Sequence, residues 1–374
     1  MGPGLASRPI ADLGEWLYNC RLRIRGDVSN MATARSVISI TDAKPPLFVG
    51  VDVGGTNIKI GIVDDDGQTV AYSKIITYEE RGPADAVQRV ADMIRDTVAD
   101  ELQGTREIVA AGLGTPGSMD IPRGRILFPP NLPHWKDFPI RDALSEACGL
   151  PVAYANDANA AAYGEFWVGS GREHRSMIML TLGTGVGGGI IVDGLSIDGT
   201  NSFGSECGHI IVDSRPDARQ CVWGGGAGQL EAYASASAVA ARALDLLPQH
   251  PDTSVRQRVE GGEELTTLML FQEAESGDAF SLDVIMEAAR YLGIGIVTLV
   301  HTIDPGVVIL GGAMNFGRHD TQVGRAFLEA VQREFQQRAF DVVAENTTID
   351  YARLGGDAGY IGAAGIARKM YQDQ

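Results

Sequence analysis

Two stretches of the chain share one hydrophobic pattern. In residues 47–64 an apolar run leads into the turn Gly54-Gly55-Thr56-Asn57, and isoleucines at every second position then lead to an Asp-Gly ending. Residues 178–194 repeat this order, with Gly183-Thr184-Gly185 at the tip. Two apolar runs joined by a small-residue turn predict a β-hairpin. Because the hairpins lie about half a chain apart, we expect two similar half-domains that face one nucleotide across a cleft.

The rest of the chain alternates between segments with the hydrophobic pattern of a helix and segments with that of a strand. Apolar residues spaced as on one helix face predict a helix at about 83–103, and short apolar runs predict buried strands. The other elements expected are strands at 70–76, 108–113, 152–155 and 307–310, helices at 140–148 and 158–166, a run of helices to about residue 301, and a final helix from 358. Strands alternating with helices indicate α/β layers.

The hairpin tips are candidate phosphate sites. Glycine has no Cβ and tolerates positive φ, so backbone N–H groups at such a tip can approach a bulky anion. The pattern differs from a P-loop and from a dinucleotide fingerprint, in which glycines precede a helix. For one hairpin alone, an ordinary tight turn would explain the glycines equally well. The second copy favours phosphate binding.

Composition narrows the class of protein. The chain has 374 residues, 44% of them hydrophobic, and a formal net charge of −17. This length predicts two domains, and the charge disfavours nucleic acid and anionic membranes as partners. ATP is also an anion, so backbone dipoles and Mg²⁺ would have to hold its phosphates.

The expected compartment is the cytoplasm. Four cysteines are too few for a disulfide framework, which fits a reducing environment. The longest apolar run, residues 291–303, is too short to span a bilayer. Residues 1–45 show no signal-peptide core. We expect either that they are a poorly structured, loosely attached extension or that the natural protein starts at Met31.

The sequence Asn156-Asp157-Ala158-Asn159-Ala160 places a carboxylate where a strand meets an alanine-rich helix. Asn and Asp are also common helix N-caps, so this pair alone would be read as a cap. Between two phosphate hairpins, however, the motif resembles the catalytic motif of the ROK family of sugar kinases, which belongs to the actin-like ATPase superfamily. The resemblance covers about residues 46–370.

The resemblance implies a two-domain actin-like α/β (ribonuclease H-like) fold with a nucleotide and sugar cleft between the domains. The first domain would comprise residues 46–155 and 357–374, and the second residues 156–356. It also implies that Asp157 is the general base for a sugar hydroxyl. We expect the adjacent helix N-terminus to keep this carboxylate ionised at neutral pH.

Sugar contacts are implied for several segments. Glu206-Cys207-Gly208-His209 resembles the family's Glu and His motif for ring hydroxyls, although a lone histidine is more often structural. The residues expected to contact the sugar are Gly117, Ser118, Asn131, Asn156, Asp157, Glu206, His209 and Glu231.

The hairpins and the segment after the strand at 307–310 are expected to bind ATP. Asp52 matches an acidic residue near Mg²⁺, where it would act through water. The expected ATP-binding residues are Asp52, Gly54, Gly55, Thr56, Asn57, Lys59, Gly183, Thr184, Gly185, Gly311 and Gly312.

The chain departs from the family at its structural zinc site. The positions of three zinc-binding cysteines hold Val222, Gly224 and Gln229. Cys221 lies one residue before the first of these positions, and Cys207 and His209 could join it. Because a closed zinc site needs four nitrogen or sulfur ligands, we expect no structural zinc.

The first reading is an ATP-dependent hexokinase, most similar to the glucokinase branch, that makes glucose 6-phosphate and forms a homodimer. Alternatives keep the mechanism with N-acetylmannosamine, N-acetylglucosamine, fructose or mannose as acceptor, or with polyphosphate as donor. A reading of another class is a non-catalytic sugar-sensing regulator, against which the acidic charge and the lack of a DNA-reading module argue.

Overall fold

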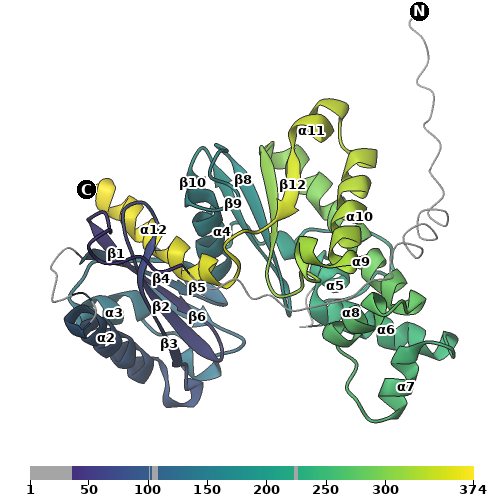
Figure 1. Ribbon diagram of the computed structural model, residues 1–374, viewed down its shortest axis with the longest axis horizontal. Helices are drawn as coiled ribbons and strands as arrows, with labels where there is room; N and C mark the ends of the chain where they lie inside the picture. The colour runs from purple at the N-terminus through teal and green to yellow at the C-terminus, as the bar shows by residue number, and fades with distance from the viewer. Residues whose placement is uncertain (1–35, 101, 103–107, 223–225) are drawn as a thin grey trace, which may run out of the picture. The chain divides into compact units, whose positions relative to one another are not determined.

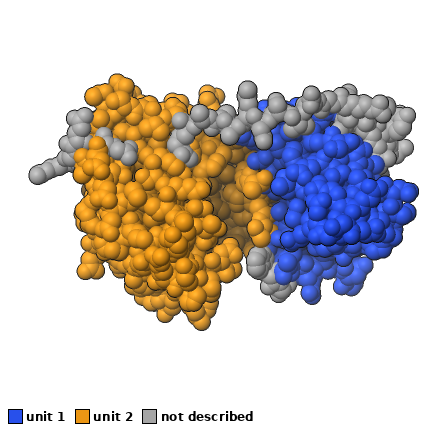
Figure 2. Space-filling view, turned by 60° about the horizontal axis from the view of Figure 1, so that its bottom comes forward, with its two compact units in different colours: residues 1–31, 211–297, 314–339 blue, residues 32–210, 298–313, 340–374 orange. Residues whose placement is uncertain are grey.

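The computed structural model describes residues 36–100, 102, 108–222 and 226–374. These residues form two compact units (Figure 2). One, which we call unit 1, includes residues 211–297 and 314–339, and the other, unit 2, includes residues 36–210, 298–313 and 340–374. This division differs from the predicted domains, so the boundary near residue 156 stays a prediction.

Unit 2 contains two five-stranded sheets of the same design. The first has the order β3-β2-β1-β4-β7, and the second has the order β10-β9-β8-β11-β12. In each sheet, three consecutive strands pair antiparallel, and two further strands then add in parallel. The strands are β1 Leu47–Val53, β2 Asn57–Val63, β3 Thr69–Ile76, β4 Ile108–Thr115, β7 Val152–Asn156, β8 Met177–Leu182, β9 Val186–Val192, β10 Leu195–Ser196, β11 Val307–Gly311 and β12 Thr348–Tyr351. The predicted duplication of the hairpin is therefore confirmed and extends to the whole sheet.

Helices cover both faces of the first sheet (Figure 1). Along β1, Leu47, Val49 and Val51 pack with α2 (Pro83–Asp100) and α3 (Ile140–Cys148), whereas Phe48 packs with α12 (Ala358–Gln372). This alternation follows from the period of two in a strand. It also directs Asp52 toward α12, where the side chain lies against Gly359. The prediction that the final helix packs on the first half of the chain is confirmed.

Helix α4 (Asp157–Trp167) joins the two sheets of unit 2, because it packs against α12 and also against β9 of the second sheet. Small residues allow the close approach of the two helices. A side chain at Gly362 of α12 would overlap the carbonyl oxygen of Ala160 in α4. The N-terminus of α4, which carries Asp157, is thereby fixed between two sheets.

Several elements of unit 2 lie outside the predicted set. These are the hairpin β5 (Ser118–Asp120) and β6 (Arg125–Phe128), strands β10 and β12, helix α11 (Asp341–Asn346), and the 3₁₀ turns η1 (Glu79–Arg81), η2 (Pro133–Trp135), η3 (Cys207–His209) and η6 (Gly355–Asp357). Residues 36–46 contain no strand or helix, yet Ile38 and Ile40 pack against the first core. Residues 1–35 lie outside the described part, so the expectation of a poorly structured extension over residues 1–45 stays a prediction.

Unit 1 is helical. Its helices are α5 Glu231–Ala234, α6 Ala236–Leu246, α7 Ser254–Glu260, α8 Thr267–Glu275, the long α9 Ala279–Ile303, which continues into unit 2, and α10 Gln322–Arg338, with the 3₁₀ turns η4 Leu247–Gln249 and η5 Arg318–Asp320. Residues 291–303 end a helix of 25 residues, long and apolar enough to cross a membrane by length and composition. The expectation that this stretch is too short is therefore wrong. The window is 67% buried inside the protein, as in a core helix.

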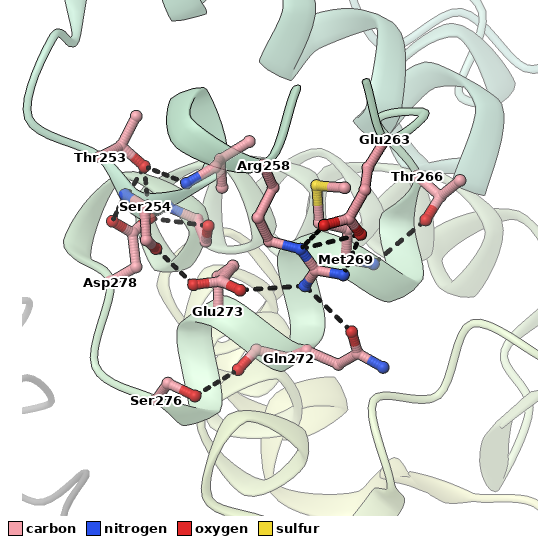
Figure 3. Close-up of polar contacts among 12 residues, drawn as sticks. Thr253, Ser254, Arg258, Glu263, Thr266, Met269, Gln272, Glu273, Ser276 and Asp278 are labelled. Atoms are coloured by element: carbon pink, nitrogen blue, oxygen red, sulfur yellow. Dashed lines mark hydrogen bonds and ion pairs between the residues drawn. The ribbon is translucent and has the colours of Figure 1, made fainter. Parts of the chain in front are cut away.

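A polar network fixes α7 to α8 and α9 (Figure 3). The carboxylate of Asp278 accepts hydrogen bonds from Thr253 Oγ1 at 2.9 Å and from Ser281 N at 2.8 Å. Arg258 donates to Glu273 of α8 at 3.0 Å and to Glu263 at 2.6 Å. These contacts join α7 to α8 and to the start of α9.

Candidate active site

Asp157 is the first residue of α4, directly after β7. Its Oδ1 accepts a hydrogen bond from Ala158 N at 2.8 Å. The preceding side chain, Asn156, accepts from Ala158 N at 2.8 Å and from Asn159 N at 3.4 Å. Asn156 is thus the N-cap of α4, the structural role weighed for this pair, and its cap bonds fix the backbone that presents Asp157.

The pKa of Asp157 is raised to about 7, above the usual value for aspartate. Burial is the largest cause, and the negative charges of Asp52 and Glu206 add to it. The hydrogen bond from Ala158 N acts in the opposite direction and is outweighed. The expectation that the helix N-terminus keeps this carboxylate fully ionised at neutral pH is therefore wrong.

Asp52 lies near the end of β1 in the first hairpin. Burial raises its pKa, and the charge of Lys59 partly offsets that effect. Lys59 Nζ lies 3.3 Å from Asp52 Oδ2 and donates to the Gly356 carbonyl at 2.7 Å. The pair connects the hairpin to the segment before α12.

The first hairpin tip is exposed at Gly55 and Thr56. Thr77, which is fully buried, donates to the Gly54 carbonyl at 2.7 Å and so holds the tip from below. A Cβ on Gly55 would lie 3.3 Å from the Cβ of Asn131, so the structure brings this tip next to the predicted sugar loop. Neither glycine has a positive φ. Of the two properties of glycine that the sequence analysis named, the missing Cβ matters at this tip, and the tolerance of positive φ does not.

The second hairpin and the Gly311-Gly312 segment also lie together. Gly311 pairs with Thr181 of β8, and Gly312 has a φ of 92°. A side chain at Gly312 would overlap the carbonyl oxygen of Leu182, directly before the tip at Gly183. The second hairpin and the Gly311-Gly312 segment therefore lie side by side on the second sheet of unit 2. The first hairpin, also expected to bind ATP, belongs to the first sheet.

Glu206 directly precedes the 3₁₀ turn η3, and His209 is the last residue of that turn. His209 Nε2 lies 3.8 Å from Glu206 Oε2, and both side chains are about half exposed. The turn packs on β9, where a side chain at Gly188 would overlap Cys207. Burial, and then the charge of Glu206, raises the pKa of the Cys207 thiol to about 12, so this thiol stays protonated.

The remaining predicted sugar residues fall into two groups. Gly117 has a φ of 84° and lies against Pro129, while the Ser118 hydroxyl accepts from Phe128 N at 3.2 Å. These contacts join β5 to the loop that carries Asn131. Glu231 is a buried residue at the start of α5 in unit 1. Its part in the site stays a prediction.

The carboxylates present suit a hard cation such as Mg²⁺. Asp52 and Asp157 are close enough for one charge to raise the pKa of the other, and oxygen ligands of this kind are those that Mg²⁺ prefers. Across the described residues there is no group of three or more His, Cys, Asp or Glu side chains arranged to hold a metal. Asp52 would therefore be one contact among waters and phosphate oxygens.

At the family's zinc position, the Cys221 thiol donates to Gln229 Oε1 at 3.0 Å, so the one nearby cysteine is engaged with a residue that replaces a ligand. Gly224 and Gly225 lie outside the described residues. The absence of structural zinc stays a prediction.

Sequence reasoning missed a hydrogen bond between a residue of the Asp157 motif and a distant loop. Asn159 Nδ2 donates to Asp198 Oδ1 at 3.0 Å. The signal for Asn159 was present in the motif itself, whereas Asp198 comes from a loop that no local pattern connects to α4.

The model of one protein family, described as the ROK family, matches residues 48–370. This chain belongs to the ROK family. The glucokinase of Halalkalibacterium halodurans is 34% identical over 324 residues, which cover 86% of this chain and 95% of that protein. The ROK family glucokinase from Streptomyces griseus, whose crystal structure contains glucose and AMPPNP, is 32% identical with a TM-score of 0.67, covering 86% of this chain and 99% of that one.

The family also contains regulators. The xylose repressor of Caldicellulosiruptor bescii is 30% identical over 312 residues, covering 82% of this chain and 74% of that protein. The chain is thus a ROK protein with the two-domain actin-like α/β fold, as the sequence predicted, and its relatives include hexose kinases and repressors.

Proposed function

We propose that this protein is an ATP-dependent hexokinase that converts glucose to glucose 6-phosphate, with Asp157 as general base. The observation that carries the proposal is the place of Asp157, a carboxylate held at the N-terminus of α4 by the Asn156 cap. Burial, together with the charges of Asp52 and Glu206, raises its pKa to about 7. A carboxylate poised near neutral pH is suited to accept a proton from an alcohol. The similarity to glucokinases supports the same reaction.

In the proposed reaction the 6-hydroxyl oxygen of the sugar attacks the γ-phosphorus of ATP. The new O–P bond forms as the bond from phosphorus to the bridging oxygen breaks, ADP leaves with that electron pair, and Asp157 takes the hydroxyl proton. Positioning contributes most in phosphoryl transfer, and the base assists. Bound Mg²⁺, with Asp52 as a contact, would neutralise charge on the phosphates.

The other predicted residues would orient the two substrates. Glu206 and His209 present half-exposed polar groups that can bind ring hydroxyls, and Asn131 lies beside the first hairpin tip. Glu231, Gly117 and Ser118 are assigned to the sugar through the family resemblance. The hairpin tips and Gly311-Gly312 are assigned to ATP on the same basis.

The test is release of ADP from Mg-ATP with glucose, mannose, fructose, N-acetylglucosamine or N-acetylmannosamine, and with polyphosphate as a second donor. We expect glucose to be used and Asp157→Ala to lower kcat by about 100-fold or more. Asp142→Asn, an exposed change on α3, is the control and should keep full activity. If only another sugar is phosphorylated, that sugar replaces glucose as the proposed substrate. If Asp157→Ala keeps its activity, the proposal that Asp157 is the general base is refuted.

A second candidate function is sugar-dependent regulation of transcription, which the repressor relatives favour. The net charge of −17 opposes binding to DNA. A gel shift on genomic fragments with and without sugar distinguishes the two, because the kinase should shift none. We also expect a cytoplasmic homodimer, and light scattering after size-exclusion chromatography tests the dimer.

A further inference from the structure

The loop 197–204 connects β10 to Glu206 and is closed at its base. Gly204 N donates to the Asp198 carbonyl at 2.7 Å, and Ser205 Oγ donates to the Ile197 carbonyl at 2.9 Å. Ile190 N of β9 in turn donates to Ser205 Oγ at 3.1 Å. If residues 197, 198, 204 and 205 at the closed end of this loop moved, Glu206 would move with them, because it is the next residue along the chain.

The same loop is bound to the helix that carries Asp157. Asn159 Nδ2, two residues after Asp157 in α4, donates to Asp198 Oδ1 at 3.0 Å, and Ser196 Oγ donates to the same oxygen at 3.2 Å. Asn159 is only 4% exposed, and its Oδ1 has no hydrogen-bond partner among the described residues. A buried amide with an unsatisfied oxygen carries a free-energy cost, which the bond to Asp198 only partly offsets.

The tip of the loop has a third attachment. Ile121 N, directly after β5, donates to Ser202 Oγ at 3.0 Å. Ser202 and Ser205 have φ angles of 60° and 67°, in the left-handed region that favours glycine. Non-glycine residues in that region are strained and persist where the surrounding contacts hold them. Those contacts are the three attachments described above.

From this geometry we infer that Asn159 and Asp198 are positioning residues for the acceptor sugar. Their hydrogen bond couples the α4 N-terminus, with Asp157, to the segment of Glu206 and His209, and the Ser202 contact extends the coupling to β5 beside Ser118. The linked segments carry Asp157, Glu206, His209 and Ser118, which are all expected to contact the sugar. Strand β9 of the second hairpin contributes one bond, from Ile190 N to Ser205 Oγ, whereas the residues expected to bind ATP contribute none of the bonds described above. The inference rests on the proposed kinase activity.

The test compares steady-state constants for Asp198→Ala, Asn159→Ala and the double variant with those of the wild type. We expect each single variant to raise the KM for glucose about tenfold and to leave the KM for ATP within about twofold, because misplaced sugar contacts weaken sugar binding. Both variants break the bond between Asn159 and Asp198, and Asp198→Ala also removes the acceptor of Ser196 Oγ. The double variant should therefore resemble Asp198→Ala.

Two further variants serve as controls. Asp198→Asn keeps an acceptor for Asn159 Nδ2 and adds an amide that can donate to its unsatisfied oxygen, so we expect near-normal KM for glucose. Asp193→Asn removes an exposed carboxylate that pairs with Arg175 in the same hairpin, and should be neutral. If Asp198→Ala does not fold, Ser202→Ala replaces it, since it removes only the contact to Ile121 and should also raise the KM for glucose.

A normal KM for glucose in Asp198→Ala, an equal rise in both KM values, or multiplied effects in the double variant would overturn the inference. A wild type that releases no ADP with any sugar would instead refute the proposed kinase. The same variants would then be compared by calorimetric titration with glucose, in which unchanged sugar affinity would overturn the inference as well.

Discussion

The backbone of Gly50 in β1 lies directly against the carbonyl group of Tyr360 in α12. A side chain at Gly50 would overlap that oxygen, and α12 has little room to move because its residues Tyr360, Ala363 and Ala364 are buried. The strand that leads to Asp52 and the helix that lies against Asp52 are therefore packed backbone to backbone.

Gly50→Ala should destabilise the protein by about 2 to 4 kcal/mol, because overpacking of a rigid contact displaces the backbone. The measurement is urea unfolding followed by fluorescence. Gly356→Ala is the matched control, since Gly356 is exposed and a side chain there meets nothing within 4 Å. An unchanged unfolding midpoint in Gly50→Ala would show that α12 can move away from β1.

The sequence predicted the strands of the first sheet because their apolar alternation is local. It could not predict which glycine meets a helix about 310 residues later, because close approach depends on tertiary packing. Helix α10 is a different case. Its buried residues Val323, Phe327 and Val331 follow helical spacing, so the signal was present and was not used.

The same distinction applies to the site. The motif around Asp157 was sufficient to predict the base and its place at a helix N-terminus. Its pKa was predicted in the wrong direction, because the local helix effect is readable from sequence while burial and the charge of Asp52 come from distant segments. The partner of Asn159 was missed for the same reason.

Asp157→Asn should be more stable than the wild type above neutral pH, although we expect it to lose activity. The folded pKa of Asp157 is about 7, above its ordinary value near 4, so folding favours the protonated form. The stability that this group contributes is fully present below pH about 4 and is lost as pH rises through about 7. The neutral amide avoids that loss.

The expected gain is about 1 to 3 kcal/mol at pH 8, shrinking toward zero near pH 4. Thermal unfolding of both proteins at a series of pH values measures it. A constant difference between the two melting temperatures at all pH values would mean that Asp157 does not titrate differently in the folded state.

Asp52→Asn should lower the pKa of Asp157, because it removes a negative charge that disfavours ionisation of the base. The pKa can be followed directly by NMR of isotope-labelled aspartate in the nucleotide-free protein. Asp66→Asn, which removes an exposed carboxylate that pairs with Lys44, should leave it unchanged. A higher or equal pKa for Asp157 in Asp52→Asn would rule out the coupling.

Chelation should not destabilise the protein, because Val222 and Gln229 replace zinc ligands and Cys221 donates to Gln229. We expect less than about 0.1 zinc per chain by elemental analysis and one melting temperature with and without a chelator. Stoichiometric zinc, or a fall in melting temperature on chelation, would contradict this.

Asp278→Ala should destabilise unit 1. Its carboxylate accepts from Thr253 Oγ1, Ser254 N, Ser281 N and Ser281 Oγ, and so caps the starts of α7 and α9 together (Figure 3). Thr253 is only 5% exposed, so its hydroxyl would lose its hydrogen-bond acceptor in a buried place. Loss of a shared cap and of a buried partner should cost about 2 to 3 kcal/mol.

Asp252→Ala is the control for this change, since Asp252 is exposed in the same loop. Hydrogen exchange should show faster exchange in α7 and at the start of α9 in Asp278→Ala, while β1 and β4 of unit 2 keep their protection. Uniformly faster exchange in both units would instead mean that the two units unfold as one.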